Sequence, residues 1–208
     1  MKTVIFDMDG VLLDSELIYL NALKKYLEKL NVEASIEELS VVVGMKIEAI
    51  TQYLKEKYVL TETIEELIKG QDVYFAEEER QTELKPMDGL LEYLKFLKDK
   101  RINIALASSS DLNWINRVLV ALDIRKYFDV ICSGEEVKYS KPHPEIFLLA
   151  AERTESKPEE CIVIEDSVNG IKAGKEAGMF VIGYKGSKIT QDTSNAHREI
   201  YSFHELIE

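Results

Sequence analysis

Two aspartates, Asp7 and Asp9, follow a short apolar run near the start of the chain. The run covers residues 3–6 (TVIF), and a glycine follows Asp9. Side chains two positions apart in an extended chain lie on the same side, so the two carboxylates can share one site. One could then bind Mg²⁺ and attack an electrophile while the other transfers protons. Aspartates also cap the turns that follow strands, so the pair alone supports both interpretations equally.

Three further apolar runs or loops carry residues of similar chemistry. Ser108 ends an apolar run, and Ser109 follows it where backbone N–H groups at a helix start would bind an anion. Lys141 lies in SKPHPE, where two prolines restrict the backbone around it. Glu165 and Asp166 end another run, and two adjacent acids favour a cation between them. Taken singly, a helix start capped by Ser110 or Asp111 would explain the serines that begin at Ser108, and a capping role would explain Asp166. A solvated surface position would explain Lys141.

The elements that must position these residues alternate between short apolar strands and amphipathic helices. We expect buried strands at residues 3–7, 102–108, 128–133, 161–166 and 179–184. The strand at 179–184 is expected to be the last of the chain. Helices are expected over 111–122, from about 144, and over 167–177. Continuous apolar strands separated by helices predict a parallel sheet covered on both faces. Ligands of such sheets bind beyond the carboxyl ends of the strands, where the candidate residues lie.

Residues 15–83 follow a different pattern, because they contain no convincing strand. Leucines recur at helical spacing over residues 17–30, and a second helix is expected over 46–58, with a third after it. We therefore expect two domains. The core would comprise residues 1–14 and 84–208, and residues 15–83 would form a small all-helical domain inserted after the first strand.

The composition excludes several classes of partner. The chain has 208 residues, of which 46% are hydrophobic and 31% charged, as in ordinary globular proteins. Its formal net charge of −12 argues against binding to nucleic acid or to an anionic membrane surface. No apolar run is long enough to span a membrane and the start lacks signal-peptide features, so we expect a cytoplasmic protein. Cys132 and Cys161 lie in apolar strands, where reduced core thiols are expected.

Together, the sequences DMDGVLLDSE, ALASSS, SKPHPEIF and EDSVNGIKAGKEAGM resemble the four motifs of the haloacid dehalogenase superfamily. More narrowly, they resemble its β-phosphoglucomutase-like phosphatase branch, which carries a helical cap domain after the first motif. The second aspartate of DMDG distinguishes the chain from the haloacid dehalogenases proper. The resemblance covers essentially the whole chain. It implies a Rossmann-like α/β catalytic core, a cap at residues 15–83, a small phosphorylated metabolite as substrate, and a monomer.

The resemblance also implies catalytic roles. Asp7 would attack phosphorus and form an aspartyl-phosphate. Asp9 would protonate the leaving oxygen and then deprotonate the water that hydrolyses the intermediate. Ser108, with N–H groups near Ser109, would bind the phosphoryl oxygens together with Lys141. Lys141 would also offset the negative charge of nucleophile and phosphate, because two anions must approach each other.

The same resemblance implies a Mg²⁺ ion as cofactor. Asp7, the backbone carbonyl of Asp9, and Asp166 would be ligands of the metal. Glu165 would be either a direct or a water-mediated ligand, and both options stay open at this point. Oxygen ligands of this kind suit Mg²⁺.

The expected activity is Mg²⁺-dependent hydrolysis of a small phosphorylated metabolite, with sugar phosphates first among the substrates. Mutases of this branch carry a cap histidine where this chain has Tyr19, and a cap arginine where it has Ile47. Lys46 could partly replace that arginine, so a β-phosphoglucomutase-type mutase stays the alternative. Tyr19 and Lys46 are therefore the candidates for substrate specificity in the cap.

A phosphorylatable receiver domain is a remote alternative from another functional class. Receivers combine an aspartate nucleophile, an acidic metal site, a hydroxyl residue and a lysine on a parallel sheet. They lack a helical insertion and a second aspartate two residues after the nucleophile, and this chain has both features. A signalling module is therefore the least favoured of the three functions.

Overall fold

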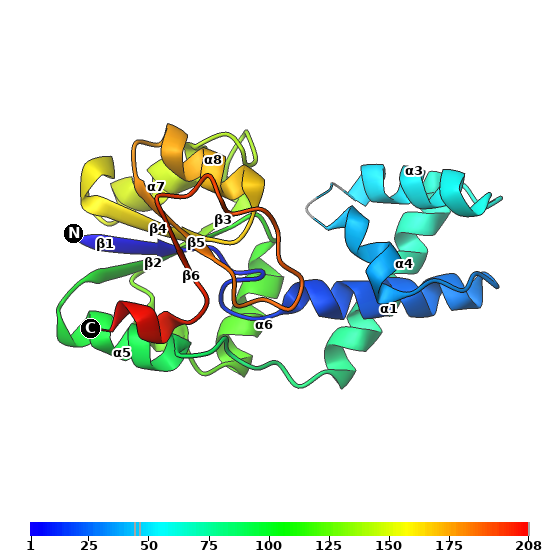
Figure 1. Ribbon diagram of the computed structural model, residues 1–208, viewed down its shortest axis with the longest axis horizontal. Helices are drawn as coiled ribbons and strands as arrows, with labels where there is room; N and C mark the ends of the chain where they lie inside the picture. The colour runs from blue at the N-terminus through cyan, green and yellow to red at the C-terminus, as the bar shows by residue number, and fades with distance from the viewer. Residues whose placement is uncertain (44, 46, 208) are drawn as a thin grey trace. The chain divides into compact units, whose positions relative to one another are not determined.

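The chain folds as two compact units, one comprising residues 1–14 and 84–208, the other residues 15–83. The computed structural model describes residues 1–43, 45 and 47–207. The first unit contains all the strands of the described residues, and the second is helical (Figure 1). The boundaries of the two units coincide with those expected from the sequence for a core and an inserted helical domain.

A parallel sheet of six strands forms the centre of the first unit (Figure 1). The strands are β1 (Thr3–Phe6), β2 (Asn103–Ser108), β3 (Val130–Ser133), β4 (Cys161–Glu165), β5 (Phe180–Tyr184) and β6 (Arg198–Ile200). Their order is β3-β2-β1-β4-β5-β6, and every neighbouring pair is parallel. The chain therefore builds the sheet outward from β1 on one side and then crosses to β4 on the other.

The predicted parallel sheet is confirmed, but the sequence analysis missed its last strand. β6 has three residues, and two of them, Arg198 and Glu199, are exposed. It pairs with β5 at the edge of the sheet, where only Ile200 is buried. A short edge strand needs no continuous apolar run. The expectation that residues 179–184 form the final strand was therefore wrong.

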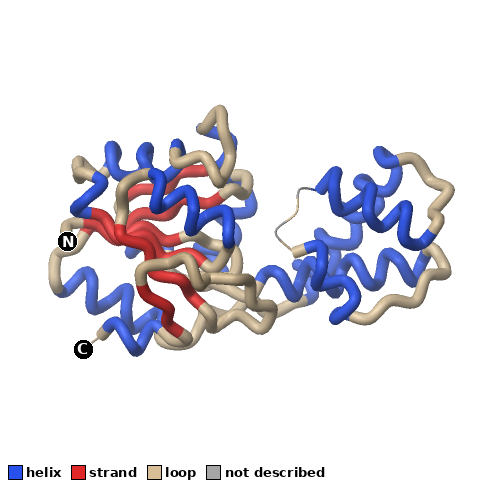
Figure 2. The backbone as a smooth tube through the Cα atoms, turned by 45° about the horizontal axis from the view of Figure 1, so that its top comes forward, coloured by secondary structure: helices blue, strands red, loops and turns tan. Residues whose placement is uncertain are grey.

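Helices cover both faces of the sheet (Figure 2). On one face, α7 (Glu145–Arg153) packs against β1–β3 and α8 (Val168–Glu176) packs against β4 and β5. The other α-helices among the described residues of this unit are α5 (Leu90–Asp99), which packs against β2, and α6 (Leu112–Ala121). The predicted helices after β2, β3 and β4 are α6, α7 and α8.

Alternation along β1 divides the core between the two faces of the sheet. Ile5 is fully buried in a cluster with Phe147 of α7 and Val163 of β4. The next side chain, Phe6, packs with its ring 6.0 Å from Tyr93 of α5 and 5.9 Å from Phe203. Each fully buried side chain of this size stabilises the fold by about 1.5–3 kcal/mol. The free thiols of the two cysteines are buried in the same unit, as expected.

The second unit contains α1 (Ser15–Lys29), α2 (Ile36–Leu39), α3 (Ile47–Tyr58) and α4 (Ile64–Gln81). Three of the leucines at helical spacing, Leu20, Leu23 and Leu27, are buried in α1, and this helix packs against α4. The short helix α2 was not predicted; it begins with a capping box between Ser35 and Glu38. Among the described residues of the chain, no helix is both long and apolar enough to cross a bilayer.

Candidate active site

The three acids expected at the ends of β1 and β4 lie together. Asp7 directly follows β1, Glu165 ends β4, and Asp166 follows it, while the two strands are paired neighbours. One oxygen from each carboxylate lies within 4.8 Å of the others, and all three residues are buried. Because the chain crosses from one side of β1 to the other at this point, the acid cluster occupies the edge where open parallel sheets bind ligands.

Lys141 brings a cation to the acid cluster from the loop before α7. Its ammonium donates to Asp7 Oδ1 at 2.5 Å, to Glu165 Oε1 at 2.9 Å and to the carbonyl oxygen of Ala107 at 3.2 Å. The lysine side chain is only 7% exposed. Hydrogen bonds from a buried ammonium to three acceptors fix its position, because each N–H group has a partner.

Burial and charge act in opposite directions on this ion pair. Burial raises the pKa of Asp7 to about 7; the Lys141 ammonium limits the rise, and the carboxylates of Glu165 and Asp9 add to it. Burial by itself would lower the pKa of Lys141, but the attraction of Asp7 and Glu165 outweighs it and raises the pKa. Lys141 therefore keeps its charge at neutral pH, where Asp7 changes its protonation.

Glu165 uses both of its carboxylate oxygens as hydrogen-bond acceptors. Oε1 accepts from Lys141, and Oε2 accepts from the backbone N–H of Ser167 at 2.6 Å and from its hydroxyl at 2.9 Å. Gly170 leaves the room that this arrangement needs, since a Cβ there would lie 1.6 Å from Glu165 Oε1. The start of α8 thus holds Glu165 against Lys141, a support that the sequence analysis did not foresee.

Gly10 brings the backbone that follows β1 against Asp166. Its φ of +76° is in the left-handed region, and a Cβ at this position would lie 1.9 Å from Asp166 Oδ2. The turn is closed by a hydrogen bond from the Gly10 N–H to the Leu13 carbonyl at 2.9 Å. Glycine satisfies both the conformation and the close approach.

Ser108 and Ser109 lie at the end of β2, next to β1 in the sheet. Ser108 is fully buried, and its hydroxyl oxygen accepts from the backbone N–H of Ser110 at 3.1 Å. Ser109 is exposed. The cap of the following helix is provided by Asp111, whose side chain accepts from a backbone N–H in the first turn. Ser108 therefore stabilises the turn, and the helix cap is Asp111, one of the two residues that the sequence offered for it.

The carboxylate of Asp9 is held by residues that follow β2. Its Oδ2 accepts from the Ser110 hydroxyl at 2.8 Å, and its Oδ1 accepts from the indole N–H of Trp114 at 3.3 Å. Neither Ser110 nor Trp114 was predicted from the sequence as a residue of the site. The available signal was the position of the single tryptophan of the chain, in the first turn of the helix that begins at the carboxyl end of β2.

Tyr19, one of the two candidates for specificity in the cap, is bonded inside the helical unit. Its hydroxyl donates to Gln71 Oε1 at 3.0 Å, and Gln71 Nε2 donates to Thr51 Oγ1 at 3.0 Å. Burial, with smaller contributions from two acidic neighbours, raises the pKa of Tyr19. The hydroxyl therefore serves the packing of α1, α3 and α4. Lys46, the other candidate, lies outside the described residues.

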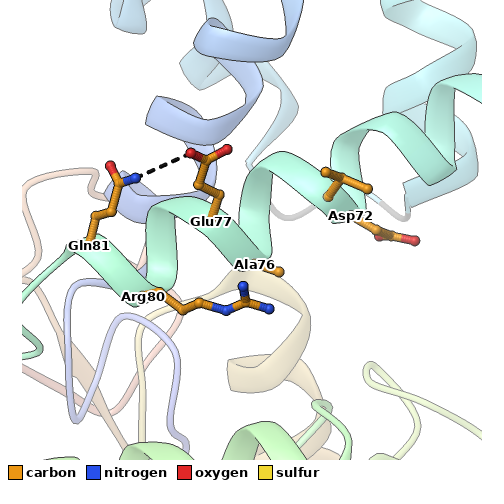
Figure 3. Close-up of a pocket in the computed structure, with 6 residues that line it drawn as sticks. Asp72, Ala76, Glu77, Arg80 and Gln81 are labelled. Carbon is orange, nitrogen blue, oxygen red and sulfur yellow. Dashed lines mark hydrogen bonds between the residues drawn. The ribbon is translucent and has the colours of Figure 1, made fainter.

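An open pocket of the helical unit lies along α4 (Figure 3). Its lining residues recur at helical spacing and are Asp72, Val73, Ala76, Glu77, Arg80 and Gln81. The side chain of Gln81 donates to Glu77 Oε1 at 3.2 Å, the contact drawn as a dashed line in Figure 3. Two acids and one arginine give the pocket mixed charge, so its lining does not by itself favour an anion.

The acid cluster has the properties of a site for a divalent cation. Its donors are carboxylate oxygens, which hard cations such as Mg²⁺ prefer. When all groups are ionised, its three carboxylates and the single ammonium of Lys141 leave a net charge of −2. Buried negative charge of this size is unfavourable, and a divalent cation would offset it. The residues therefore fit the ion that the motif resemblance implies.

Comparison with known proteins identifies the family to which this site belongs. The model of the haloacid dehalogenase-like hydrolase family matches residues 4–184. The chain is a member of that family. A phosphorylated carbohydrates phosphatase of Thermotoga maritima is 37% identical over 180 residues, which cover 86% of this chain and 82% of that protein. Hexitol phosphatase B of Escherichia coli is 34% identical over 181 residues, covering 84% of this chain and 79% of that protein.

Solved structures of this family agree with the fold described above. A crystal structure of a Thermotoga maritima protein, provisionally assigned as a β-phosphoglucomutase, is 33% identical with a TM-score of 0.84. The match covers 100% of this chain and 97% of that protein. The superfamily and the Rossmann-like α/β fold expected from the motifs are therefore confirmed. This haloacid dehalogenase-like hydrolase, whose relatives are named phosphatases, is a phosphoric monoester hydrolase.

Proposed function

We propose that this haloacid dehalogenase-like hydrolase is a Mg²⁺-dependent phosphatase of a small phosphorylated metabolite, acting through an aspartyl-phosphate on Asp7. The observation that carries the proposal is the pairing of Asp7 with Lys141 inside a buried acid cluster. The names of the two relatives specify phosphorylated carbohydrates and a hexitol, which supports sugar phosphates as the first substrates to test.

Asp7 would be the nucleophile that attacks phosphorus. Its carboxylate and the phosphate are both anions, and the Lys141 ammonium, 2.5 Å from Asp7, offsets part of their repulsion. The P–O bond to the leaving alcohol breaks as the bond to Asp7 forms. Hydrolysis of the aspartyl-phosphate then regenerates the carboxylate, so one difficult displacement is divided into two easier steps.

Asp9 would transfer the proton in each step. Its carboxyl group would give a proton to the leaving oxygen, and its carboxylate would then accept one from the water that attacks the aspartyl-phosphate. Ser108 and the backbone N–H groups near Ser109 would bind the phosphoryl oxygens, since N–H groups at a helix start favour anions. These roles assign a separate task to the ends of β1 and β2.

Asp7 and Asp166 would bind Mg²⁺ together with the backbone carbonyl of Asp9. When bound, the ion supplies Lewis-acid stabilisation of charge on the transferring phosphoryl group. Glu165 fits a water-mediated position better than a direct one, because both of its oxygens already accept hydrogen bonds. Its own contribution would be to hold Lys141 beside Asp7.

The two units would divide the work of the enzyme. Residues 1–14 and 84–208 would form the catalytic core, and residues 15–83 would act as the cap that selects the substrate. The engaged hydroxyl of Tyr19 supports a role in shaping the cap rather than in direct hydrogen bonding to a substrate. We further propose a monomeric, cytoplasmic enzyme, and light scattering of the purified chain tests the monomer.

A screen of phosphorylated metabolites in the presence and absence of Mg²⁺ tests the proposal. We expect release of phosphate from one or more sugar phosphates, loss of that activity with a chelator, and loss in Asp7→Asn. Acid quenching during turnover, followed by mass spectrometry, should locate one phosphoryl group on the peptide that contains Asp7. Turnover at the wild-type rate in Asp7→Asn would refute the assignment of Asp7 as the nucleophile.

A sugar-phosphate mutase is the second candidate, because the structural relative with a TM-score of 0.84 is provisionally assigned as a β-phosphoglucomutase. The discriminating substrate is β-glucose 1-phosphate with a catalytic quantity of glucose 1,6-bisphosphate. Formation of glucose 6-phosphate faster than free phosphate would favour the mutase. Release of phosphate without isomerisation would favour the phosphatase.

A further inference from the structure

The two oxygens of the Asp9 carboxylate accept hydrogen bonds from two different side chains. Ser110 donates its hydroxyl to Oδ2 at 2.8 Å, and Trp114 donates its indole N–H to Oδ1 at 3.3 Å. Donors on separate oxygens oppose rotation of the carboxylate plane as well as movement of the side chain. The orientation of Asp9 is therefore set by the segment that follows β2.

Both donors are available to Asp9 because Asp111 caps helix α6. The Asp111 side chain accepts from the backbone N–H of Trp114 at 3.0 Å. Ser110, which precedes the cap, therefore does not need its hydroxyl for the helix start. The same cap fixes the first turn of the helix and hence the position from which the indole of Trp114 reaches Asp9.

The indole ring of Trp114 is itself held in place. Trp114 is 6% exposed. Arg117 follows it by one helical turn, and its guanidinium lies 5.4 Å from the centroid of the indole ring. A cation over an indole face is attracted to the ring, and it favours a ring whose N–H edge points toward an anion. The indole of Trp114 thus contacts Arg117 through its ring face and Asp9 through its N–H group.

We propose that Trp114 and Ser110 are positioning residues for Asp9, and that Trp114, as the single tryptophan, is an optical reporter of the Asp9 carboxylate. The inference rests on the proposed function, in which Asp9 gives a proton to the leaving oxygen. A carboxyl group held in one orientation transfers that proton without first being reorganised. The indole N–H can only donate, so it holds Oδ1 in both protonation states of Asp9, and the proton lies on Oδ2, where the Ser110 hydroxyl can turn from donor to acceptor.

Substrates with different leaving groups separate a positioning role from a structural one. An alkoxide such as that of a sugar leaves poorly without a proton, whereas p-nitrophenolate leaves as a stable anion. In Trp114→Phe, which keeps an aromatic ring and removes the N–H, kcat/KM for the sugar phosphate should fall by about 10-fold or more. The value for p-nitrophenyl phosphate should change by less than about 2-fold, since kcat/KM reports only the steps through departure of the leaving group.

Ser110→Ala should show the same preference for p-nitrophenyl phosphate, because it removes the other donor. Equal losses with both substrates, or no loss with either, would overturn the positioning role. Wild-type protein that hydrolyses no phosphate ester would instead refute the proposed function, and the fluorescence experiment would still test the contact. The two failures are therefore distinguishable.

Emission of Trp114 provides a test that needs no turnover. Replacement of Asp9 by Asn exchanges the carboxyl group beside the indole N–H for an amide and should shift the emission maximum or intensity of the full-length protein. The matched control is Asp129→Asn, an acid whose carboxylate accepts from Lys98 and from the backbone of Ile104. An Asp9→Asn spectrum that superimposes on the wild type, or an equal change in the control, would overturn the assignment of Trp114.

Discussion

Lys141 and Asp7 form a buried ion pair in which Nζ and Oδ1 are 2.5 Å apart. Glu165 accepts from the same ammonium at 2.9 Å, so one lysine compensates two buried carboxylates. Removal of one partner of a buried ion pair leaves the other charge uncompensated, which costs about 3–5 kcal/mol. This relationship couples the stability of the core to the proposed reaction.

Lys141→Met should therefore lower both activity and stability. We expect kcat to fall by about 10²–10³-fold, the loss that follows removal of one transition-state donor. The free energy of unfolding should fall by about 3 kcal/mol, measured by urea denaturation with a chelator present. Lys138→Met is the matched control because Lys138 is exposed, and it should change stability by less than about 0.5 kcal/mol.

The double variant Asp7→Asn/Lys141→Met removes both charges of the Lys141–Asp7 ion pair. It should recover part of the stability lost in Lys141→Met, because one of the two carboxylates that lacked a cation becomes a neutral amide while Glu165 keeps its charge. It should recover none of the activity, since the nucleophile is absent. Additive losses of stability in the double variant would contradict the coupling.

Gly10→Ala should damage the acid cluster, whereas Gly178→Ala should not. Both glycines have a φ of +76°, so both substitutions carry the strain of placing alanine in the left-handed region, about 1 kcal/mol or more. A Cβ at Gly10 would lie 1.9 Å from Asp166 Oδ2, while at Gly178 its nearest neighbour is 3.9 Å away. Isothermal titration with Mg²⁺ should show weaker binding only for Gly10→Ala, and equal affinities for both variants would count against this view.

Binding of Mg²⁺ should strengthen as pH rises through about 7, where the buried Asp7 loses its proton. The folded protein holds this proton above the ordinary pKa of an aspartate, so its contribution to stability is present at low pH and is lost as pH rises through about 7. Mg²⁺ must displace the proton, and it should therefore raise Tm more at about pH 8 than at about pH 5. The Asp7→Asn variant should bind Mg²⁺ weakly and with no change in affinity through about pH 7. If Mg²⁺ raises the Tm of the wild type equally at both pH values, the prediction is refuted.

Gln71→Leu should destabilise the helical unit through the Tyr19–Gln71–Thr51 hydrogen bonds. The glutamine is 4% exposed, and its loss leaves the hydroxyl of Tyr19 without its acceptor at a cost of about 1–3 kcal/mol. Gln81→Leu in the same helix is the matched control, because Gln81 is exposed and bonds only to Glu77 among the described residues. Hydrogen exchange of peptides from residues 15–83 should accelerate in Gln71→Leu alone; equal exchange in both variants would show that these hydrogen bonds contribute nothing.

The strands and the acids that follow them could be predicted because both signals are local. Residues 3–6 and 161–164 are short runs of apolar or β-branched residues, and Asp7 stands directly after the first as Glu165 and Asp166 stand directly after the second. Parallel strands place their carboxyl ends at one edge, so the proximity of these acids follows from the pattern. β6 escaped prediction for the converse reason, since an edge strand of three residues needs no apolar run.

The sequence alone determined the family, the parallel sheet, the helical insertion and the residues that stand at the strand ends, because motif order and hydrophobic periodicity are written in consecutive residues. Only the tertiary structure decided which partner each group would have. It paired Lys141 with both Asp7 and Glu165, set Gly10 against Asp166, and turned the Asp9 carboxylate toward Ser110 and Trp114. The physical reason is that hydrogen bonds and ion pairs between residues far apart in the sequence depend on distances to within a few tenths of an ångström, which packing fixes and spacing in the sequence does not.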